Sequence, residues 1–450
     1  MGRRSRARAL AVWVNGRRVG EWHIPARGDM ELRYDPAWMA TEEGRPLSLS
    51  LPFGLDQAPV RGAAVAAYFD NLLPDADVIR KRLQDQFHTL TRDTFDLLAA
   101  IGRDCVGAVQ LLAIDEAPQD IATIEARPLS EGEVERALVD AVAQPAFGAP
   151  APDFRISIAG AQEKTALLLH QGQWCRPLGA TPTTHIFKLP LGLVGGMLVD
   201  MSASVENQWL CAAILRAYGL PVAACEIGQF GRQKALVVER FDRQRHSSGT
   251  HWLRLVQEDF CQVYATPSSR KYERDGGPGM GEIAKILRAS VKREQDLATL
   301  FKAQLLFWML AATDGHAKNF SLRILAGGRY QLTPLYDVLS LWPVIGDGAS
   351  QIAWHNARLA MAVRGQHKHY HLKDIQRRHF NAMAAQCGLG ESTEPLIEEI
   401  LAATPGVVAR VQQTLPGDFP QQLLDAVLGG LEVSAKRLAN MPAGFPNPNA

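Results

Sequence analysis

The stretch "LATLFKAQLLFWMLAATDGHAKNF", residues 297–320, joins a long apolar run to a compact polar segment. The spacing of the apolar residues predicts a helix that ends near residue 313. Four polar side chains follow within six residues: Asp314, His316, Lys318 and Asn319. Polar groups at the end of a buried helix cost free energy unless they are paired or do chemistry. Two interpretations are open: an ordinary helix end with Gly315 as its cap, or a catalytic loop.

The composition is that of a folded protein with more than one domain. The chain has 450 residues, of which 47% are hydrophobic and 21% charged, and this length favours two or three domains. The net charge of +1 gives no reason to propose a protein that coats nucleic acid, so any DNA contact would need a local patch or a partner. The six cysteines show no CxxC spacing, which favours reduced, packed thiols over a zinc or redox site.

The chain carries no signal for export or membrane insertion. The N-terminal stretch 1–16 is basic but lacks the apolar core of a signal peptide. No uninterrupted apolar run reaches membrane-spanning length. We therefore expect a cytoplasmic protein with no membrane partner.

The pattern of elements changes near residue 259. Before it, residues 10–24 predict a hairpin turning at Asn15-Gly16, residues 63–87 predict helix interrupted at Pro74, and residues 142–155 read as a linker. Strand signals and one helix follow: the strand-like stretches are 164–170, 184–190, 223–230 and 234–243, and the helix is 204–220. After residue 259, helical spacing dominates, over 282–313, 393–415 and 419–440. The sequence predicts an α+β fold of two lobes: 1–258, with parts 1–112 and 150–258, and an all-α lobe 259–450.

The spacing from Asp314 to Asn319 matches a catalytic loop. In protein kinases an Asp accepts the proton of the substrate hydroxyl, and an Asn five residues later binds metal. Asp337, in "LTPLYDVLS", follows a predicted hairpin with Gly327-Gly328 at its tip. It is either an ordinary turn residue or, with Asn319, a ligand for Mg²⁺, which prefers hard oxygen atoms and phosphate.

Three features upstream fit the binding of a nucleotide. The turn "AGAQEKT", residues 159–165, can present backbone N–H groups to phosphate, although by itself it also reads as an ordinary hairpin. Lys188 lies on a predicted strand, and it is either an ordinary edge or surface residue or the strand lysine with which a kinase grips phosphates. The strand "VVERF" leads to Glu239 and Phe241, at the place of a kinase hinge or of a salt-bridged surface segment. Together with the later loops, the order of these parts is that of a phosphoryl-transfer enzyme.

At this point the sequence resembles a known family. The stretches that carry the resemblance run from near the N-terminus to past residue 380: "RPLSLSLP", "FDNLLPD", "FDLLAAIGRDCVGAV", "FRISIAGAQEKTALLL", "TPTTHIFKLP", "VERFDR", "QEDFCQ", "KYERDGGPG", "ATDGHAKNFS", "LTPLYDVLS" and "RHF". They resemble the HipA family, the kinase toxins of HipBA-type toxin–antitoxin pairs. The resemblance implies a kinase-like fold of two lobes with the ATP site between them, and ATP- and Mg²⁺-dependent serine/threonine kinase activity.

The resemblance also implies residue roles. Asp314 would be the catalytic base, Asn319 and Asp337 the metal ligands, and Ser157 the site of inactivating autophosphorylation. The ATP-binding residues implied are Ala159, Gly160, Ala161, Gln162, Glu163, Lys164, Lys188, Glu239, Arg240, Phe241, His316, Ala317, Lys318 and Asn319. A phosphate on Ser157, beside the phosphate loop, would repel nucleotide and favour an ejected loop.

The family's substrate class is glutamyl-tRNA synthetase, whose phosphorylation leads to growth arrest and persistence. Its partner is HipB, a helix-turn-helix antitoxin that binds operator DNA and would bring the toxin to the nucleoid as a corepressor. Ala385 and Gly388 stand where the family pattern has basic residues near DNA, so we expect this chain to reach DNA through the antitoxin. Two alternatives are a kinase-shaped corepressor with little activity and a small-molecule phosphotransferase.

Overall fold

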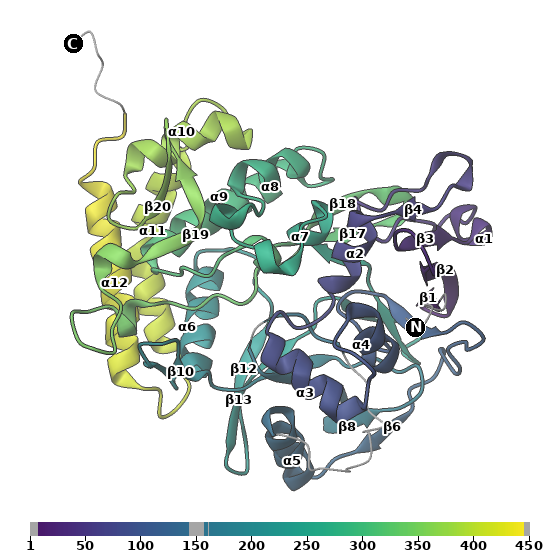
Figure 1. Cartoon of the computed structure of the whole chain (residues 1–450). Helices are drawn as coiled ribbons and strands as arrows, with labels where there is room; N and C mark the ends of the chain where they lie inside the picture. The colour runs from purple at the N-terminus through teal and green to yellow at the C-terminus, as the bar shows by residue number, and fades with distance from the viewer. Residues whose placement is uncertain (1–7, 144–156, 161, 445–450) are drawn as a thin grey trace. The chain divides into compact units, whose positions relative to one another are not determined.

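The computed structural model describes residues 8–143, 157–160 and 162–444 (Figure 1). The chain divides into two compact units, each assembled from three segments. Unit 1 comprises residues 1–189, 228–270 and 321–330, and unit 2 comprises 190–227, 271–320 and 331–450. This division differs from the predicted boundary at residue 259, because later strands return to unit 1 and helix α6 (Ser204–Ala217) belongs to unit 2.

Unit 1 begins with a five-stranded sheet of order β4-β3-β2-β1-β5. Its strands are β1 (Arg8–Val14), β2 (Arg17–Ile24), β3 (Glu31–Tyr34), β4 (Val60–Arg61) and β5 (Gln110–Ala113). The predicted hairpin is confirmed: β1 and β2 pair antiparallel, and Asn15 and Gly16 have φ of 48° and 77°, as a tight hairpin turn requires. Trp22 stacks on Phe69 with ring centroids 3.9 Å apart, in the core between sheet and helices.

Helices of the described part of unit 1 accompany this sheet. They are α1 (Pro36–Met39), α2 (Ala63–Asp70), α3 (Asp77–Phe87) and α4 (Thr94–Ile101). The predicted interruption at Pro74 is confirmed, because α2 ends at Asp70 and α3 begins at Asp77. Proline lacks the backbone N–H that a continuing helix would need.

A six-stranded sheet carries the candidate nucleotide residues of unit 1. Its order is β12-β13-β9-β7-β8-β6. The strands are β6 (Ala126–Pro128), β7 (Lys164–His170), β8 (Gln173–Pro177), β9 (His185–Lys188), β12 (Cys225–Phe230) and β13 (Gln233–Glu239). Helix α5 (Glu131–Val142) begins with a capping box formed by Ser130 and Glu133. The predicted linker after it lies largely outside the described residues.

Smaller elements complete unit 1. They are the hairpin β14 (Arg243–Arg245) and β15 (Trp252–Arg254), helix α7 (Phe260–Val263), and the strands β16 (Gln257–Asp259) and β17 (Ser321–Ile324). The sheet of β16 and β17 continues into β18 (Tyr330–Leu332), a strand that begins at the last residue of the third unit 1 segment. The adjacent β17 and β18 confirm the hairpin predicted around Gly327-Gly328.

Unit 2 is mainly helical. Besides α6 its helices are α8 (Met280–Leu287), α9 (Arg293–Met309), α10 (Arg377–Cys387), α11 (Glu394–Gln413) and α12 (Gln421–Ala439). The α+β class is confirmed, but the expectation of an all-helical second part is wrong in one respect. A hairpin of β19 (Arg358–Arg364) and β20 (Lys368–His371) lies in this unit, besides the short hairpin of β10 (Gly192–Val194) and β11 (Val199–Met201).

Candidate active site

The candidate catalytic loop begins where α9 ends. Ala311 adopts a left-handed conformation with φ 49°. Its N–H donates to the Trp308 carbonyl at 3.2 Å, and the N–H of Ala312 donates to the Phe307 carbonyl at 2.8 Å. This pair of bonds is a Schellman motif, which satisfies the last carbonyls of the helix. The helix is therefore capped before the polar segment begins, and the interpretation of Gly315 as its cap is wrong.

Gly315 has a different role, which is close packing. A Cβ atom at this position would lie 2.5 Å from two ring carbons of Phe307. Phe307 is buried, and its ring centroid lies 5.9 Å from that of Phe320. The turn that contains Asp314 thus packs closely on the core of unit 2. This packing fixes the backbone at Asp314, while the Asp314 side chain is 63% exposed.

Hydrogen bonds inside the loop join Asp314 to Asn319. The Asn319 side-chain amide donates to the Asp314 carbonyl at 2.9 Å, and the His316 N–H donates to the same carbonyl at 2.8 Å. The Asn319 amide also lies 3.4 Å from the carbonyl of Asp337. His316, Ala317, Lys318 and Asn319 are all buried. Unit 2 therefore brings together the three residues to which the sequence assigns base and metal roles.

Asp337 is held by the segment that follows it. It has φ 61°, a left-handed conformation. Three residues later, the Ser340 hydroxyl donates to the Leu310 carbonyl at 2.6 Å, and the N–H of Leu341 donates to the Ala311 carbonyl at 3.1 Å. The loop after Asp337 is thus bonded to the C-terminal cap of α9, the helix that directly precedes the loop with Asp314.

A side chain of α6, which the sequence did not indicate, also holds the loop after Asp337. Asn207, in α6, donates its amide to the Ser340 carbonyl at 2.8 Å and accepts from the Ser340 N–H at 2.9 Å. Both residues are buried. In the sequence, Asn207 stands between Glu206 and Gln208 near the start of a helix, and nothing there indicates a partner 133 residues away.

The oxygen atoms present fit a magnesium ion only in part. Asn319 and Asp337 offer the hard oxygen ligands that Mg²⁺ prefers. Among the residues that the structure describes, no group of three His, Cys, Asp or Glu gathers as a metal site. Phosphate oxygens and water would have to complete the coordination, as is usual for Mg²⁺ in phosphoryl-transfer enzymes.

In unit 1, Lys188 lies in the interior of the six-stranded sheet. It is 7% exposed and pairs with Lys164 on β7 and with Leu236 on β13. Directly opposed residues of an antiparallel pair project from the same face. The register therefore concentrates two ammonium-bearing side chains on one face of the sheet, an arrangement suited to phosphate.

The candidate phosphate loop turns tightly just before β7. Gly160 has φ 113°, and its carbonyl accepts the N–H of Asp75 at 3.1 Å. The Lys164 ammonium donates to the Ala159 carbonyl at 2.7 Å, closing the turn. The φ of Gly160 is one that residues with a Cβ atom rarely adopt, so the backbone conformation of this turn favours glycine.

Two further contacts hold the candidate phosphate loop in place. Gln162 donates its amide to the Leu189 carbonyl at 2.5 Å, and Glu163 forms an ion pair with Arg82 of α3. Ala161 lies outside the described residues. Ser157 is fully buried, and its hydroxyl donates to the Leu72 carbonyl at 2.8 Å.

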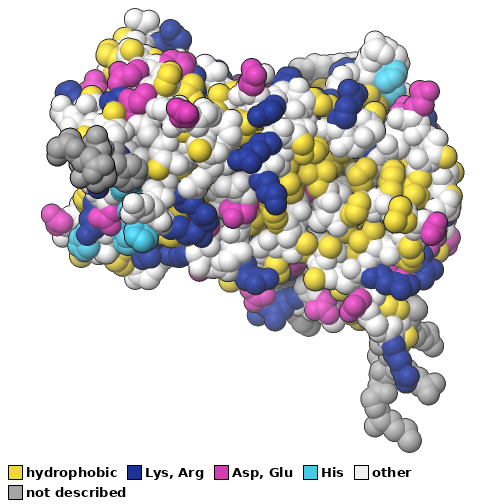
Figure 2. Space-filling view, turned by 90° about the horizontal axis from the view of Figure 1, so that it is seen from above, with side chains coloured by type: hydrophobic (Ala, Val, Ile, Leu, Met, Phe, Trp, Pro, Cys, Tyr) yellow, Lys and Arg dark blue, Asp and Glu magenta, His cyan; other side chains and the backbone are white. Residues whose placement is uncertain are grey.

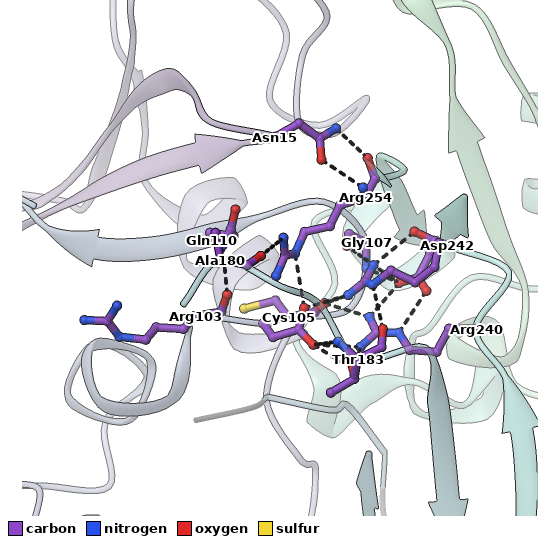
Figure 3. Close-up of polar contacts among 12 residues, drawn as sticks. Asn15, Arg103, Cys105, Gly107, Gln110, Ala180, Thr183, Arg240, Asp242 and Arg254 are labelled. Carbon is purple, nitrogen blue, oxygen red and sulfur yellow. Dashed lines mark hydrogen bonds and ion pairs between the residues drawn. The ribbon is translucent and has the colours of Figure 1, made fainter. Parts of the chain in front are cut away.

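The candidate hinge contains side chains with different environments. Glu239, the last residue of β13, is exposed, and Phe241 is half-buried. Arg240 is 3% exposed, and its guanidinium donates to Asp242, to Thr183 and to the Cys105 carbonyl (Figure 3). Its side chain is thus part of the interior of unit 1. Any contribution of Arg240 to a hinge comes from holding the backbone in place.

Arg240 belongs to a buried cluster of opposite charges (Figure 3). The cluster comprises Asp104, Thr183, Arg240, Asp242, Arg243 and Arg254, all buried. Asp104 pairs with Arg243 at 2.9 Å and with Arg254 at 3.1 Å. Burial alone would raise the pKa of the Asp104 carboxyl, but the guanidiniums of Arg243, Arg254 and Arg240 outweigh it and hold that pKa well below its ordinary value. The motifs "GRDC" and "VERFDR" therefore meet in one ion-pair network that sequence reasoning did not predict.

Comparisons with known proteins show the family of this chain. Residues 156–408 match the model of the HipA-like C-terminal domain, and residues 10–112 match that of the HipA N-terminal domain. Y4mE of Sinorhizobium fredii is 31% identical over 409 residues, covering 90% of this chain and 92% of that protein. The serine/threonine-protein kinase toxin HipA of Shewanella oneidensis is 28% identical over 340 residues, covering 72% and 73%.

A solved structure shares the fold. The HipA chain in a complex of Shewanella oneidensis HipA, HipB and operator DNA aligns with a TM-score of 0.76 at 22% identity, over 96% of this chain and 97% of that one. No helix in the described part of the chain is both long and apolar enough to traverse a bilayer. The two family-model matches and the 31% identity to Y4mE show that the chain belongs to the HipA family of serine/threonine kinase toxins.

Proposed function

We propose that this chain is an ATP-dependent serine/threonine protein kinase that acts as the toxin of a type II toxin–antitoxin pair. One observation carries the proposal: unit 2 holds Asp314 and Asn319 in one hydrogen-bonded loop, with Asp337 beside them. This is the arrangement that protein kinases use for proton acceptance and metal binding. The family membership and the fold support the same class of reaction.

In the proposed reaction, Asp314 accepts the proton of a serine hydroxyl as the serine oxygen attacks the γ-phosphorus of ATP. Its exposure leaves it open to a protein substrate, while the packing of Gly315 on Phe307 keeps its backbone in place. Asn319 and Asp337 would hold Mg²⁺, which supplies neutralisation of phosphate charge. Within unit 1, Lys188 and the backbone of residues 159–164 would grip phosphate, and residues 239–241 would border the adenine.

We propose that Ser157 is the autophosphorylation site and an off switch. In the described conformation its hydroxyl is buried against the Leu72 carbonyl. Phosphorylation would place roughly two negative charges where no solvent reaches, so residue 157 could not return to this position afterwards. The phosphate loop, which follows two residues later, would lose its anchor.

The proposed partner is a HipB-like helix-turn-helix antitoxin, and the proposed target is glutamyl-tRNA synthetase. The structural relative was solved with HipB and operator DNA, which supports an antitoxin partner and indirect DNA binding. Under this proposal the chain would be cytoplasmic, and it would be bound to the nucleoid when the antitoxin holds it on DNA. On the face in Figure 2, Lys and Arg side chains are interspersed with Asp and Glu, in keeping with the net charge of +1. Such a surface suits recruitment to DNA by a partner better than coating of DNA.

Transfer of ³²P from γ-labelled ATP tests the proposal. Purified chain with ATP and Mg²⁺ should label Ser157 and a purified glutamyl-tRNA synthetase, with sites read by mass spectrometry. Asp314→Asn should lower labelling at least about 100-fold, because a general base typically contributes a factor of this size. Asp425→Asn, an exposed carboxylate on α12, is the matched control and should label normally.

Two results would count against the proposal. Equal labelling by the Asp314→Asn chain would remove Asp314 from the role of base. If the wild-type chain labels no protein but still binds the antitoxin on operator DNA, the kinase-shaped corepressor is the correct function.

A further inference from the structure

A tyrosine from outside the catalytic loop contacts the candidate base. The hydroxyl of Tyr272 donates to Oδ1 of Asp314 at 2.6 Å, and both residues belong to unit 2. Tyr272 lies in the stretch "KYERDGGPG", to which no role is assigned above. A bond of this length between a neutral donor and a carboxylate is at the strong end of the range.

The loop that carries Tyr272 is fixed by its neighbour. Glu273 is buried, and its carboxylate accepts the N–H of Ala362 at 2.6 Å and pairs with Lys368 at 2.9 Å. Ala362 and Lys368 lie on β19 and β20, so the hairpin of unit 2 holds the residue next to the tyrosine. A Cβ at Gly279 would lie 2.4 Å from the Glu273 carboxyl carbon, so the backbone at Gly279 packs directly against the Glu273 carboxylate.

The ring of Tyr272 is held as well. It lies edge-on to the imidazole of buried His316, with centroids 5.2 Å apart and an interplanar angle of 82°. The charged ends of Lys271 and Arg274 each lie 5.6 Å from the ring centroid. The phenol is thus held by contacts on its ring. The Asp314 side chain is 63% exposed, and the nearest ring nitrogen of His316 lies 3.9 Å from its Oδ1, so the Tyr272 hydroxyl makes the shorter contact with this carboxylate.

We propose that Tyr272 is a positioning residue for the kinase reaction and orients the carboxylate of Asp314. This inference rests on the proposed function. The phenol keeps its proton and engages Oδ1, which leaves Oδ2 for the incoming serine. The serine proton moves to Oδ2, the serine oxygen bonds to the γ-phosphorus, and the bond from that phosphorus to the bridging oxygen of ADP breaks. A base held in one orientation needs no rotational search before each proton transfer.

Tyr272→Phe isolates the hydroxyl, because phenylalanine keeps the ring contacts with His316, Lys271 and Arg274. The rate of ³²P incorporation into Ser157 and into purified glutamyl-tRNA synthetase is measured across ATP concentrations. We expect the maximal rate to fall about tenfold, a fraction of the full contribution of a general base. The ATP concentration at half-maximal rate and the melting temperature should stay unchanged, since neither depends on the orientation of the base.

Tyr218→Phe is the matched control. Its hydroxyl bonds to Thr404 at 2.7 Å between α6 and α11, so this variant also loses one phenol hydrogen bond of unit 2. We expect normal maximal rates in the control.

The outcomes separate the two proposals. A wild-type chain that labels nothing overturns the kinase assignment and this inference with it. Normal wild-type labelling together with an unaltered maximal rate in Tyr272→Phe overturns the inference alone. A fall in melting temperature with a raised ATP requirement would show that the hydroxyl only maintains structure, and would also overturn the inference.

Discussion

Glu258 is a carboxyl group that unit 1 buries completely. Its oxygens contact the Ser48 hydroxyl at 2.5 Å and the Leu49 N–H at 2.9 Å. Burial raises the pKa of Glu258 to about 8, with a smaller contribution from the neighbouring charge of Asp259, and the two hydrogen bonds only partly oppose this. The group is therefore protonated in the folded protein at neutral pH.

This burial predicts a pH dependence of stability. The unfolded chain has an ordinary glutamate pKa, near 4.3, so between that value and about 8 the folded state binds the extra proton. Stability contributed by Glu258 is fully present below this window and is lost as the pH rises through it, by at most about 1.4 kcal/mol per pH unit. Glu258→Gln should remove this slope, measured by urea unfolding from pH 5 to 8.5.

The exposed Glu432→Gln, on α12, provides the control and should keep the wild-type slope. If Glu258→Gln and wild type lose stability in parallel across the window, the folded-state pKa of Glu258 is not raised.

Spacing and the order of motifs along the chain predicted that Asp314, Asn319 and Asp337 belong to one site. The structure brings these three residues together, and their roles stay predictions. Asn207 and Tyr272 could not be predicted in the same way. Their partners, Ser340 and Asp314, lie 133 and 42 residues away. Only the folded backbone brings such pairs together.

Among the elements, α12 shows how a helix can be fitted to a neighbouring side chain. It contains the adjacent glycines Gly429 and Gly430, which face different surroundings. A Cβ at Gly430 would lie 2.3 Å from an atom of the Trp342 indole, whereas a Cβ at Gly429 would meet nothing within 4 Å. Trp342 in turn donates its indole N–H to the Met309 carbonyl at the end of α9 at 2.9 Å.

The two glycines should therefore respond in opposite directions to alanine. Gly430→Ala should destabilise the protein by about 1–3 kcal/mol, because the indole has to move. Gly429→Ala should stabilise it by up to about 1 kcal/mol, because alanine is the better helix former. Chemical denaturation of the two variants checks this. Equal effects in both would mean that the helix is not fitted to Trp342.

The helices were the most predictable elements, because their apolar residues recur at helical spacing over long windows. Strand β19 was missed for a physical reason. Its residues from Leu359 to Val363 are all buried, so the strand lacks the alternation of apolar and polar residues that marks a half-exposed strand. A short, fully buried run cannot be told from helix by its periodicity.

For the whole molecule, the chain passes repeatedly between the two units, after residues 189, 227, 270, 320 and 330. Sequence composition predicted a single boundary, since it reports the local type of element and not its spatial neighbours. Each unit has its own buried groups: the cluster around Asp104 in unit 1 and the packing of Gly430 in unit 2. A substitution at Asp104 therefore changes the buried interior of unit 1, and a substitution at Gly430 changes that of unit 2.

The interleaved segments predict that the two units unfold together. Suppose that unit 1 alone unfolded. Its segments 228–270 and 321–330 would then become disordered loops between the three folded segments of unit 2. Closing such loops costs several kcal/mol. Asp104→Asn should destabilise unit 1 by about 3–5 kcal/mol, because it leaves buried guanidiniums with too few carboxylates. Hydrogen exchange followed by mass spectrometry should then show faster exchange in peptides from the cores of both units, and Gly430→Ala should do the same from the other unit. Acceleration confined to unit 1 in the Asp104→Asn protein would show instead that unit 2 keeps its structure when its connecting segments are unfolded.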